Sequence, residues 1–322
     1  MKNGQVGHQL VPASAVTQRR IWLDLLLYPT HSLPTAAAPV VIAVAVAFRH
    51  HLVSLLPALL GFVASWFVHI AGLFYDNYEL LVRYPDNREH PELVQAYWDG
   101  DLTSSSLARA IIACLVLALL TGPYLWAVAG WPVAMFGLIG IVASLSYAGG
   151  PLAYARFGLS EIVFFAMFGV VGEVGIYYVQ AASVLGAWRQ ALATLPPEIW
   201  VLGLPAGALC VNILLIDDMR DREADAAKGW RTGAVRFGPR WARAGCVVTT
   251  CFAYAAPLLF WRAFGFSAWI LLPWVTLPLA IWILRTLYTT LRLEDLEPVT
   301  PRGAFLVFFY SAFLAVGVAI PS

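Results

Sequence analysis

Long runs of apolar residues, separated by short polar segments, dominate the chain. A helix that crosses a bilayer needs roughly 17–25 mostly apolar residues, and about nine runs meet this length. They lie near residues 33–48, 52–75, 107–128, 131–148, 161–184, 199–216, 244–264, 267–284 and 304–320. The runs are continuous, whereas barrel strands would alternate over about ten residues. The pattern therefore predicts an all-α integral membrane protein, with residues 1–322 forming a single polytopic domain.

Composition agrees with the membrane class. The chain is 60% hydrophobic and only 12% charged, and its mean hydropathy is +0.73. Soluble domains carry about 25% charged residues, so a soluble enzyme is excluded, and so is a disordered chain. The net charge of +1 leaves no basic surplus for nucleic acid. Membrane lipids are the expected surroundings.

The cations lie mainly on one side of the predicted spans. The segments on the side of the N-terminus and their flanks hold 17 of the 20 Lys and Arg residues, and the opposite side holds Arg49, Arg189 and Arg262. The positive-inside rule then predicts a multi-pass protein of the cell inner membrane with a cytoplasmic N-terminus. Residues 1–32, 83–106 and 217–243 become cytoplasmic segments.

The four cysteines fall within predicted spans and form no CxxC pair. We expect Cys114, Cys210, Cys246 and Cys251 to be small buried apolar residues rather than disulfides or metal ligands.

One acidic cluster follows the sixth run. Asp217, Asp221 and Asp225 recur at i, i+4 and i+8, which places three carboxylates on one helix face. Like charges at this spacing repel, so the row suggests a cation such as Mg²⁺, which binds through carboxylates, water and substrate phosphates. Lys228 and Arg231 follow and could bind diphosphate oxygens. The alternative is a solvated helix end whose acids pair with nearby arginines.

A second acidic cluster ends the second run. Asp76, Glu79 and Arg83 share a helix face, and His69 points the same way from two turns earlier. Pro85 should end the helix near Arg83 and leave Asp86 on the loop. The alternative here is an ordinary mixed-charge helix end. Because both acidic clusters lie on the same membrane face, an accidental pairing of the two is less plausible.

These clusters and several other stretches resemble the UbiA superfamily of intramembrane prenyltransferases, and within it the branch that prenylates 1,4-dihydroxy-2-naphthoate. The similarity to the second acidic motif covers residues 212–238. Further similar stretches are Tyr147-Ala-Gly-Gly-Pro151, Gly158-Leu-Ser-Glu161, Gly175-Ile-Tyr-Tyr-Val-Gln180 and Leu204-Pro-Ala-Gly207.

The resemblance implies a nine-helix bundle around a central cavity, with two Mg²⁺ ions under a cytoplasmic cap that includes residues 83–106 and 217–243. The residues that it assigns to the acidic motifs are Asp76, Glu79, Asp86, Asp221 and Asp225. With Asp217 these form the predicted metal-ligand set, and Asp76, Glu79, Asp221 and Asp225 are the predicted catalytic acids.

The chain departs from the family pattern at several positions. Tyr75 and Glu79 stand where the first motif has Asn and Asp, and Gly72 replaces an upstream Asn. Asp217 and Asp218 replace an Asn-Asn pair.

Other polar and aromatic residues complete the predicted site. The diphosphate-binding candidates are Arg83, Arg156, Lys228 and Arg231. The substrate-pocket candidates are His69, Tyr75, Tyr78, Tyr147, Tyr154, Tyr178 and Asn212, because aromatic faces stabilise a carbocation. For each aromatic residue, simple packing is the alternative.

Glu173 lies in the middle of a predicted span. An ionisable group in the membrane is costly, and is a functional candidate for that reason. We add it to the catalytic set, with an interhelical hydrogen bond as the alternative.

The leading hypothesis is Mg²⁺-dependent transfer of a prenyl group from a polyprenyl diphosphate to a small aromatic, quinone-precursor acceptor. A membrane terpene cyclase acting on an allylic diphosphate is the alternative. A transporter or lipid-binding protein is a third possibility, disfavoured because the charges gather at one interface rather than at mid-membrane.

Overall fold

The computed structural model describes residue 22 and residues 32–84 and 91–321, and all regular structure in this part of the chain is helical. The described residues contain seven helical segments that are long and apolar enough to cross a membrane. These segments are Leu55–Arg83, Ser104–Ala129, Ser160–Leu185, Pro197–Arg220, Pro239–Ala263, Ala268–Thr289 and Leu293–Ala319. The other two predicted runs form shorter apolar helices, Pro34–Arg49 and Pro132–Leu145. The all-helical membrane class is confirmed, and nine spans stays a prediction.

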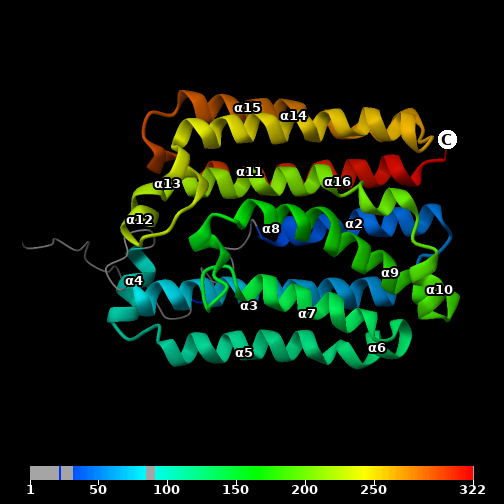
Figure 1. Ribbon diagram of the computed structural model, residues 1–322, viewed down its shortest axis with the longest axis horizontal. Coiled ribbons are helices and arrows are strands. Elements are labelled where there is room, and N and C mark those ends of the chain that lie inside the picture. The colour runs from blue at the N-terminus through cyan, green and yellow to red at the C-terminus, as the bar shows by residue number, and fades with distance from the viewer. Residues whose placement is uncertain (1–21, 23–31, 85–90, 322) are drawn as a thin grey trace, which may run out of the picture.

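The helices lie side by side in a long bundle (Figure 1). Its main helices are α2 (Ser32–Arg49), α3 (Leu55–Arg83), α5 (Ser104–Leu120), α6 (Gly122–Ala129), α7 (Pro132–Leu145), α8 (Ser160–Ala166), α9 (Gly172–Leu185), α11 (Leu204–Arg220), α14 (Pro239–Ala263), α15 (Leu277–Thr289) and α16 (Val299–Ala319). α3 packs against α5 on one side of the bundle, and α11 packs against α14 on the other. α2 lies between them in contact with α9 and α16.

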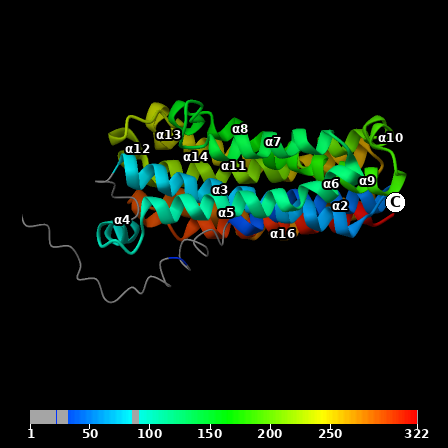
Figure 2. The same cartoon turned by 90° about the horizontal axis from the view of Figure 1, so that it is seen from below.

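Short helices gather at the two ends of the bundle. α4 (Pro91–Trp98), α12 (Arg222–Ala227) and α13 (Gly233–Phe237) lie at one end in both views (Figures 1 and 2). α10 (Trp188–Ala193) and the C-terminal end of the described chain lie at the other. The first end combines parts of the two segments predicted to form the cap.

Local sequence explains the ends of the key helices. α3 ends at Arg83, two residues before Pro85, as predicted. Thr103 caps α5 in a reciprocal pair with Ser106. Pro205 lies in the first turn of α11, where its missing N–H costs no hydrogen bond.

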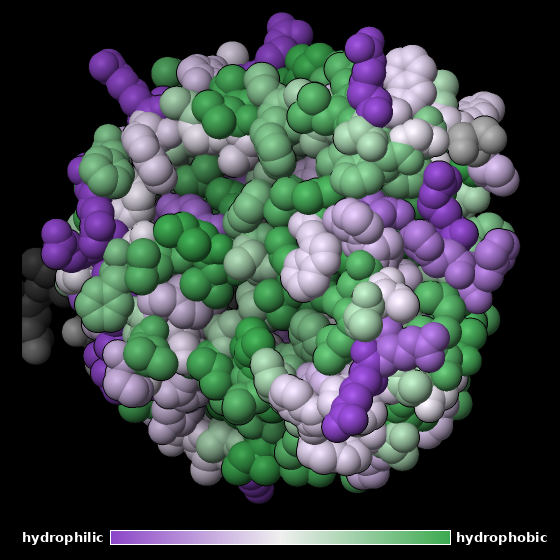
Figure 3. Space-filling model, turned by 45° about the vertical axis from the view of Figure 1, so that its right-hand side comes forward, coloured by the Kyte–Doolittle hydropathy of each residue, from purple (hydrophilic) through white to green (hydrophobic). Residues whose placement is uncertain are grey.

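Apolar side chains cover much of the outside of the bundle, as lipid contact requires. Leu55, Ile162 and Val248 are each about two-thirds exposed, and hydrophobic residues fill the centre of the face in Figure 3. The prediction of four buried cysteines is wrong for Cys251, which is exposed, while Cys114, Cys210 and Cys246 are buried. Cys251 lies on α14, on a side of the helix that the bundle leaves uncovered.

Candidate functional site

A large cavity of about 2190 Å³ lies within the bundle. Ordinary small-molecule pockets occupy roughly 300–1,000 Å³, so this one is built for a larger ligand. Its walls include α2, α3, α5, α7, α9 and α11, together with the loops at the α12 end. One face of α3 lines it from Gly61 to Arg83. At about 1.5 Å per residue this face covers about 33 Å, close to the hydrocarbon thickness of a bilayer, about 30 Å.

Five aspartates line the cavity near the α12 end. We call them the acidic rim: Asp76, Asp217, Asp218, Asp221 and Asp225. Asp218 and Asp225 are buried. Four of the five were predicted as metal ligands, and the structure brings those four to one cavity end.

Tyr147 lies in the loop between α7 and α8 and lines the same cavity as the acidic rim. Burial raises its pKa well above the usual 10, and the negative charges of Asp76, Asp218 and Asp225 raise the pKa further. Burial and Asp76 likewise raise the pKa of Tyr154, whose hydroxyl donates to the Ala143 carbonyl at 2.9 Å. Both phenols therefore stay neutral.

The three aspartates of the second cluster do not share one continuous helix, contrary to the spacing argument. α11 ends at Arg220 and α12 begins at Arg222, so Asp221 lies at the junction. Arg220 contacts Asp217 at 2.7 Å and donates from Nε to Asp221 at 2.8 Å. Because this arginine satisfies both acids locally, the chain can turn there and still keep all three aspartates on the wall.

Beyond the break, Asp225 has its own partners. Lys228 Nζ lies 3.0 Å from Asp225 Oδ1, and both side chains are buried. Thr232 donates to the other carboxylate oxygen at 3.5 Å, and the ammonium lies 4.1 Å from the centre of the Trp230 ring. Lys228 thus stands on the cavity wall beside an acid, where a diphosphate could share its charge.

The first cluster is arranged differently. Asp76 and Arg83 line the cavity, but Glu79 is buried beside it. Glu79 Oε2 accepts from Arg83 Nε at 2.6 Å and from Arg156 Nη2 at 3.3 Å. Glu79 therefore joins α3 to the loop that follows Tyr147, and Arg156 contacts Glu79 rather than the cavity.

That loop is held against the segment after α12. The Arg231 N–H donates to the Arg156 carbonyl at 3.0 Å. Gly158 has a left-handed backbone with φ +67°, and a Cβ there would lie 2.4 Å from the Arg231 carbonyl oxygen. Only glycine suits this approach. Arg231 itself is exposed and does not line the cavity.

Three of the seven predicted pocket residues lie on the cavity wall: His69, Tyr147 and Tyr154. The other four contact neighbouring helices or each other. Tyr75 and Tyr78 stack on one another with ring centres 6.2 Å apart. Tyr178 donates to the Ala129 carbonyl, and Asn212 donates to Thr250 at 2.9 Å.

Glu173 is fully buried at the start of α9, and its side chain lies against Gly203 at the N-terminal end of α11. It does not line the cavity, although its neighbours Gly172 and Gly175 do. Neither carboxylate oxygen has a hydrogen-bond partner among the described residues. The interhelical hydrogen bond that was the alternative to a catalytic role is thus not seen in this part of the chain.

Several cavity residues were missed by the sequence reasoning. They are Asn77, Tyr84, Asp218, Trp230, Thr232, Arg292, Glu294 and Glu297. Asp218 could have been found from its spacing of seven residues from Asp225, which returns to the same helical face. The last three belong to the loop before α16, which contributes a third segment to this end of the cavity. Asp86 lies outside the described residues.

The donor set suits Mg²⁺ through a shared site. Carboxylate oxygens are the ligands that Mg²⁺ prefers, usually one or two of them with water and substrate phosphates. No group of three or more His, Cys, Asp or Glu side chains that could hold a metal ion by itself is found among the described residues. Asp76, Asp218 and Asp225 all line the cavity, where their oxygens are open to a metal that a bound diphosphate also ligates. The residues therefore fit a metal held jointly by protein and diphosphate.

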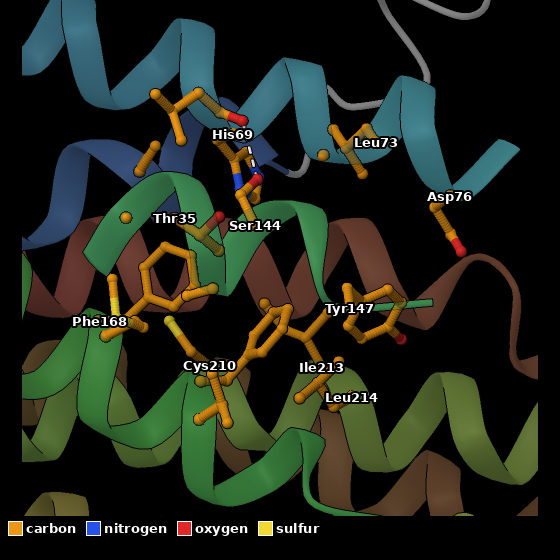
Figure 4. Close-up of a pocket in the computed structure, with 18 of the residues that line it drawn as sticks. Thr35, His69, Leu73, Asp76, Ser144, Tyr147, Phe168, Cys210, Ile213 and Leu214 are labelled. Carbon is orange, nitrogen blue, oxygen red and sulfur yellow. Dashed lines mark hydrogen bonds between the residues drawn. The ribbon is translucent and has the colours of Figure 1, made fainter. Parts of the chain in front are cut away.

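A row of aromatic rings connects the acidic rim with the middle of the cavity. We call it the aromatic wall: Tyr154, Tyr147, Phe164, Phe168 and His69, all lining the cavity. Successive ring centres are 5.7, 5.8, 5.4 and 5.9 Å apart. Figure 4 shows His69, Leu73 and Asp76 along α3, facing Phe168, Tyr147 and Cys210 across the cavity.

This helical bundle, with a long apolar cavity and an acidic rim at one end, defines a membrane protein that can hold an elongated amphipathic ligand. Residues 33–313 match the model of the UbiA prenyltransferase family. The chain belongs to this family, and it is a prenyltransferase.

Curated relatives narrow the comparison. The chain is 32% identical over 260 residues to the 1,4-dihydroxy-2-naphthoate octaprenyltransferase of Mycobacterium tuberculosis, covering 78% of this chain and 80% of that protein. It is 28% identical over 229 residues to the protein of the same name from Escherichia coli, covering 69% and 70%. The resemblance stated from the sequence is confirmed, and the cyclase alternative is not favoured.

Solved structures share the fold. A UbiA homolog from Archaeoglobus fulgidus bound to DMAPP and Mg²⁺ superposes with a TM-score of 0.51 at 18% identity, covering 92% of this chain and 99% of that one. A digeranylgeranylglyceryl phosphate synthase gives 0.53 at 15% identity, covering 94% and 99%.

Proposed function

We propose that this prenyltransferase carries out Mg²⁺-dependent transfer of a polyprenyl group to a small aromatic acceptor similar to 1,4-dihydroxy-2-naphthoate. The relatives from Mycobacterium tuberculosis and Escherichia coli are named 1,4-dihydroxy-2-naphthoate octaprenyltransferases, which supports the acceptor class and a long prenyl donor. The Mg²⁺ found with the Archaeoglobus fulgidus homolog supports the metal.

The observation that carries the proposal is that one cavity contains both a charged end and an apolar channel. One end holds the five aspartates of the acidic rim together with Arg83, Arg220 and Lys228, which suits a diphosphate with its metal. The remainder, from Gly61 to Asp76 along α3, is an apolar channel about 22 Å long by the helical rise, which suits a polyprenyl chain. A diphosphate with a long prenyl tail combines these two chemistries.

In the proposed mechanism, Asp76, Asp218, Asp221 and Asp225 would hold Mg²⁺ together with the diphosphate. The bound metal would supply charge neutralisation for the diphosphate leaving group. Lys228 and Arg83 add charge-assisted hydrogen bonds to the departing oxygens.

The reacting carbon then lies beside the aromatic wall. The bond from the first prenyl carbon to oxygen breaks, and the diphosphate leaves with the electron pair. A ring carbon of the acceptor supplies the electron pair of the new bond to the prenyl carbon, and the ring regains aromaticity by releasing H⁺ from that carbon, or CO₂ where the carbon carries a carboxylate. The ring faces stabilise the positive charge that develops, each by roughly 0.5–2 kcal/mol. The neutral hydroxyls of Tyr147 and Tyr154 avoid placing an anionic nucleophile there.

We further propose that the acidic rim faces the cytoplasm of a cell with an inner membrane. The support is the sequence bias, with 17 of the 20 cations assigned to the side that includes the rim. A water-soluble acceptor and Mg²⁺ would reach the site from that side.

The test is a turnover assay on purified protein in detergent or nanodiscs. We expect octaprenyl diphosphate and 1,4-dihydroxy-2-naphthoate to give a prenylated naphthalene product by mass spectrometry, and EDTA to stop the reaction until Mg²⁺ is restored. A product that forms equally well in EDTA would contradict the metal. If the protein consumes no polyprenyl diphosphate with any of several donors and phenolic acceptors, the proposed transfer is contradicted.

A further inference from the structure

His69 is a polar side chain in the apolar middle of the cavity. It lines the cavity wall, and its Nε2 is buried without a hydrogen-bond partner in the described part of the chain. A neutral imidazole has one N–H donor and one acceptor nitrogen. A charged imidazolium would be costly at this depth in a membrane. Nε2 of the ring can therefore still form a hydrogen bond, and a ligand in the cavity can supply the partner.

The position of His69 relative to the acidic rim fixes the size of that ligand. His69 and Asp76 lie on the same cavity-lining face of α3 (Figure 4). Seven residues of helix separate them, which is a rise of about 10 Å. A molecule that reacts beside the rim and reaches His69 must therefore be about as long as two fused aromatic rings with their substituents.

The surroundings of His69 favour an aromatic ligand. Phe168 meets the imidazole edge to face, with ring centres 5.9 Å apart and an interplanar angle of 90°. Phe168 belongs to a π-helical turn, Met167–Val171, between α8 and α9, and such turns are frequent at functional sites. Phe164 and Tyr147 continue the wall back to the rim. A planar ligand can pack against this row along its full length.

We propose that His69 binds a ring hydroxyl of the aromatic acceptor, so that this part of the cavity is the acceptor subsite and selects hydroxylated bicyclic aromatics. The proposal rests on the proposed function, because donor binding at the rim places the reacting carbon at the near end of the aromatic wall. His69 is then a substrate-binding residue, and the prenyl tail occupies the remaining apolar channel.

Steady-state kinetics with three variants test this assignment. His69→Leu removes the hydrogen bond, His69→Gln keeps a donor and an acceptor, and Cys251→Ala changes an exposed residue of α14 outside the cavity as the control. With 1,4-dihydroxy-2-naphthoate and farnesyl diphosphate, we expect His69→Leu to raise the acceptor KM about tenfold and to leave the donor KM unchanged. His69→Gln should recover most of the loss, and Cys251→Ala should match the wild type.

The two monomethyl ethers of the acceptor show which of its hydroxyls binds His69. With the ether that blocks this hydroxyl, wild type and His69→Leu should have equal acceptor KM values, because neither protein can then make the hydrogen bond. An acceptor KM in His69→Leu within twofold of wild type would overturn the proposal. So would a rise of the same size in the donor KM.

Direct binding separates this proposal from the proposed function. Quenching of tryptophan fluorescence by 1,4-dihydroxy-2-naphthoate should saturate in the wild type and require about tenfold more ligand in His69→Leu. If wild type turns over no donor but this difference is found, the proposed function fails and the acceptor subsite stands. Equal binding by both proteins, or no saturable binding by wild type, overturns the subsite whatever the turnover result.

Discussion

The ends of α3 and α11 both carry acids, but they present their charges to the cavity in different ways. α11 and the residues that follow it place four aspartates on the wall, with Arg220 and Lys228 among them. α3 places only Asp76 there, while Glu79 is buried between Arg83 and Arg156.

The contrast distinguishes acids whose side chains are available to a ligand in the cavity from acids whose side chains hold neighbouring segments of the protein together. Asp76 on α3 and Asp225 on α12 both line the cavity, so a diphosphate with its metal could contact both. Glu79 instead fixes the loop that carries Tyr147. Acids with similar sequence spacing therefore have different expected roles, and substitutions can test each role.

The largest effect is expected at Asp76 and Asp225. Asp76→Asn or Asp225→Asn should each lower kcat by roughly 100-fold or more, because each removes a carboxylate that would hold the Mg²⁺ needed to neutralise the leaving diphosphate. The measurement is the rate of product formation at saturating Mg²⁺. Asp99→Asn is the control, since Asp99 is an exposed acid that does not line the cavity. If either variant keeps a tenth of the wild-type activity, the proposed ligand-binding role of that aspartate is contradicted.

An intermediate effect is expected at Glu79. Glu79→Gln leaves Arg83 and Arg156 without their shared carboxylate, so it should reduce stability by about 1–3 kcal/mol and activity by about tenfold. Thermal unfolding and turnover measured on the same preparation will show both losses. If activity falls as far as in Asp76→Asn while the melting temperature is unchanged, Glu79 acts at the substrate and the distinction is wrong.

A smaller effect is expected at Asp217. Asp217→Asn keeps an oxygen that accepts the 2.7 Å hydrogen bond from Thr300, and Arg220 retains Asp221. We expect activity within about threefold of wild type, as for most changes that preserve the local contacts. Asp217→Leu, which loses both contacts, is the matched comparison and should be clearly less active.

The smallest effect concerns pH. Because burial and three carboxylates raise the pKa of Tyr147 above 10, its phenol stays protonated below that pH and loses its proton only above it. The profiles of kcat/KM from pH 7 to 9.5 should therefore have the same shape for wild type and Tyr147→Phe. A basic limb that disappears in Tyr147→Phe would show that the phenol ionises in this range.

The sequence predicted the membrane fold well because long apolar runs are a strong signal. Every predicted run coincides with an apolar helix, and Pro85 correctly marked the end of α3. The break at Asp221 was not predictable from i, i+4 spacing, since the same spacing occurs whether or not the helix continues through it.

The site was predicted only in part, because spacing identifies a helix face but not its partner. Asp76, Asp221, Asp225 and Lys228 reach the cavity as expected. Glu79 forms an ion pair with Arg156, and Asn212 donates a hydrogen bond to Thr250 on α14. Both contacts depend on which segments are neighbours in the fold. Glu294 and Glu297 come from a loop more than sixty residues beyond α12, which no local pattern connects to the rim.

The central claim is that the acidic rim binds an allylic diphosphate together with Mg²⁺. The most direct measurement is calorimetric titration of an unreactive thio-linked allylic diphosphate into wild type, Asp225→Asn and Asp99→Asn, each with Mg²⁺ and with EDTA. The account predicts saturable binding to wild type and Asp99→Asn that is lost in EDTA, and binding to Asp225→Asn that is at least about tenfold weaker. Equal affinity with and without Mg²⁺, or in wild type and Asp225→Asn, would contradict it.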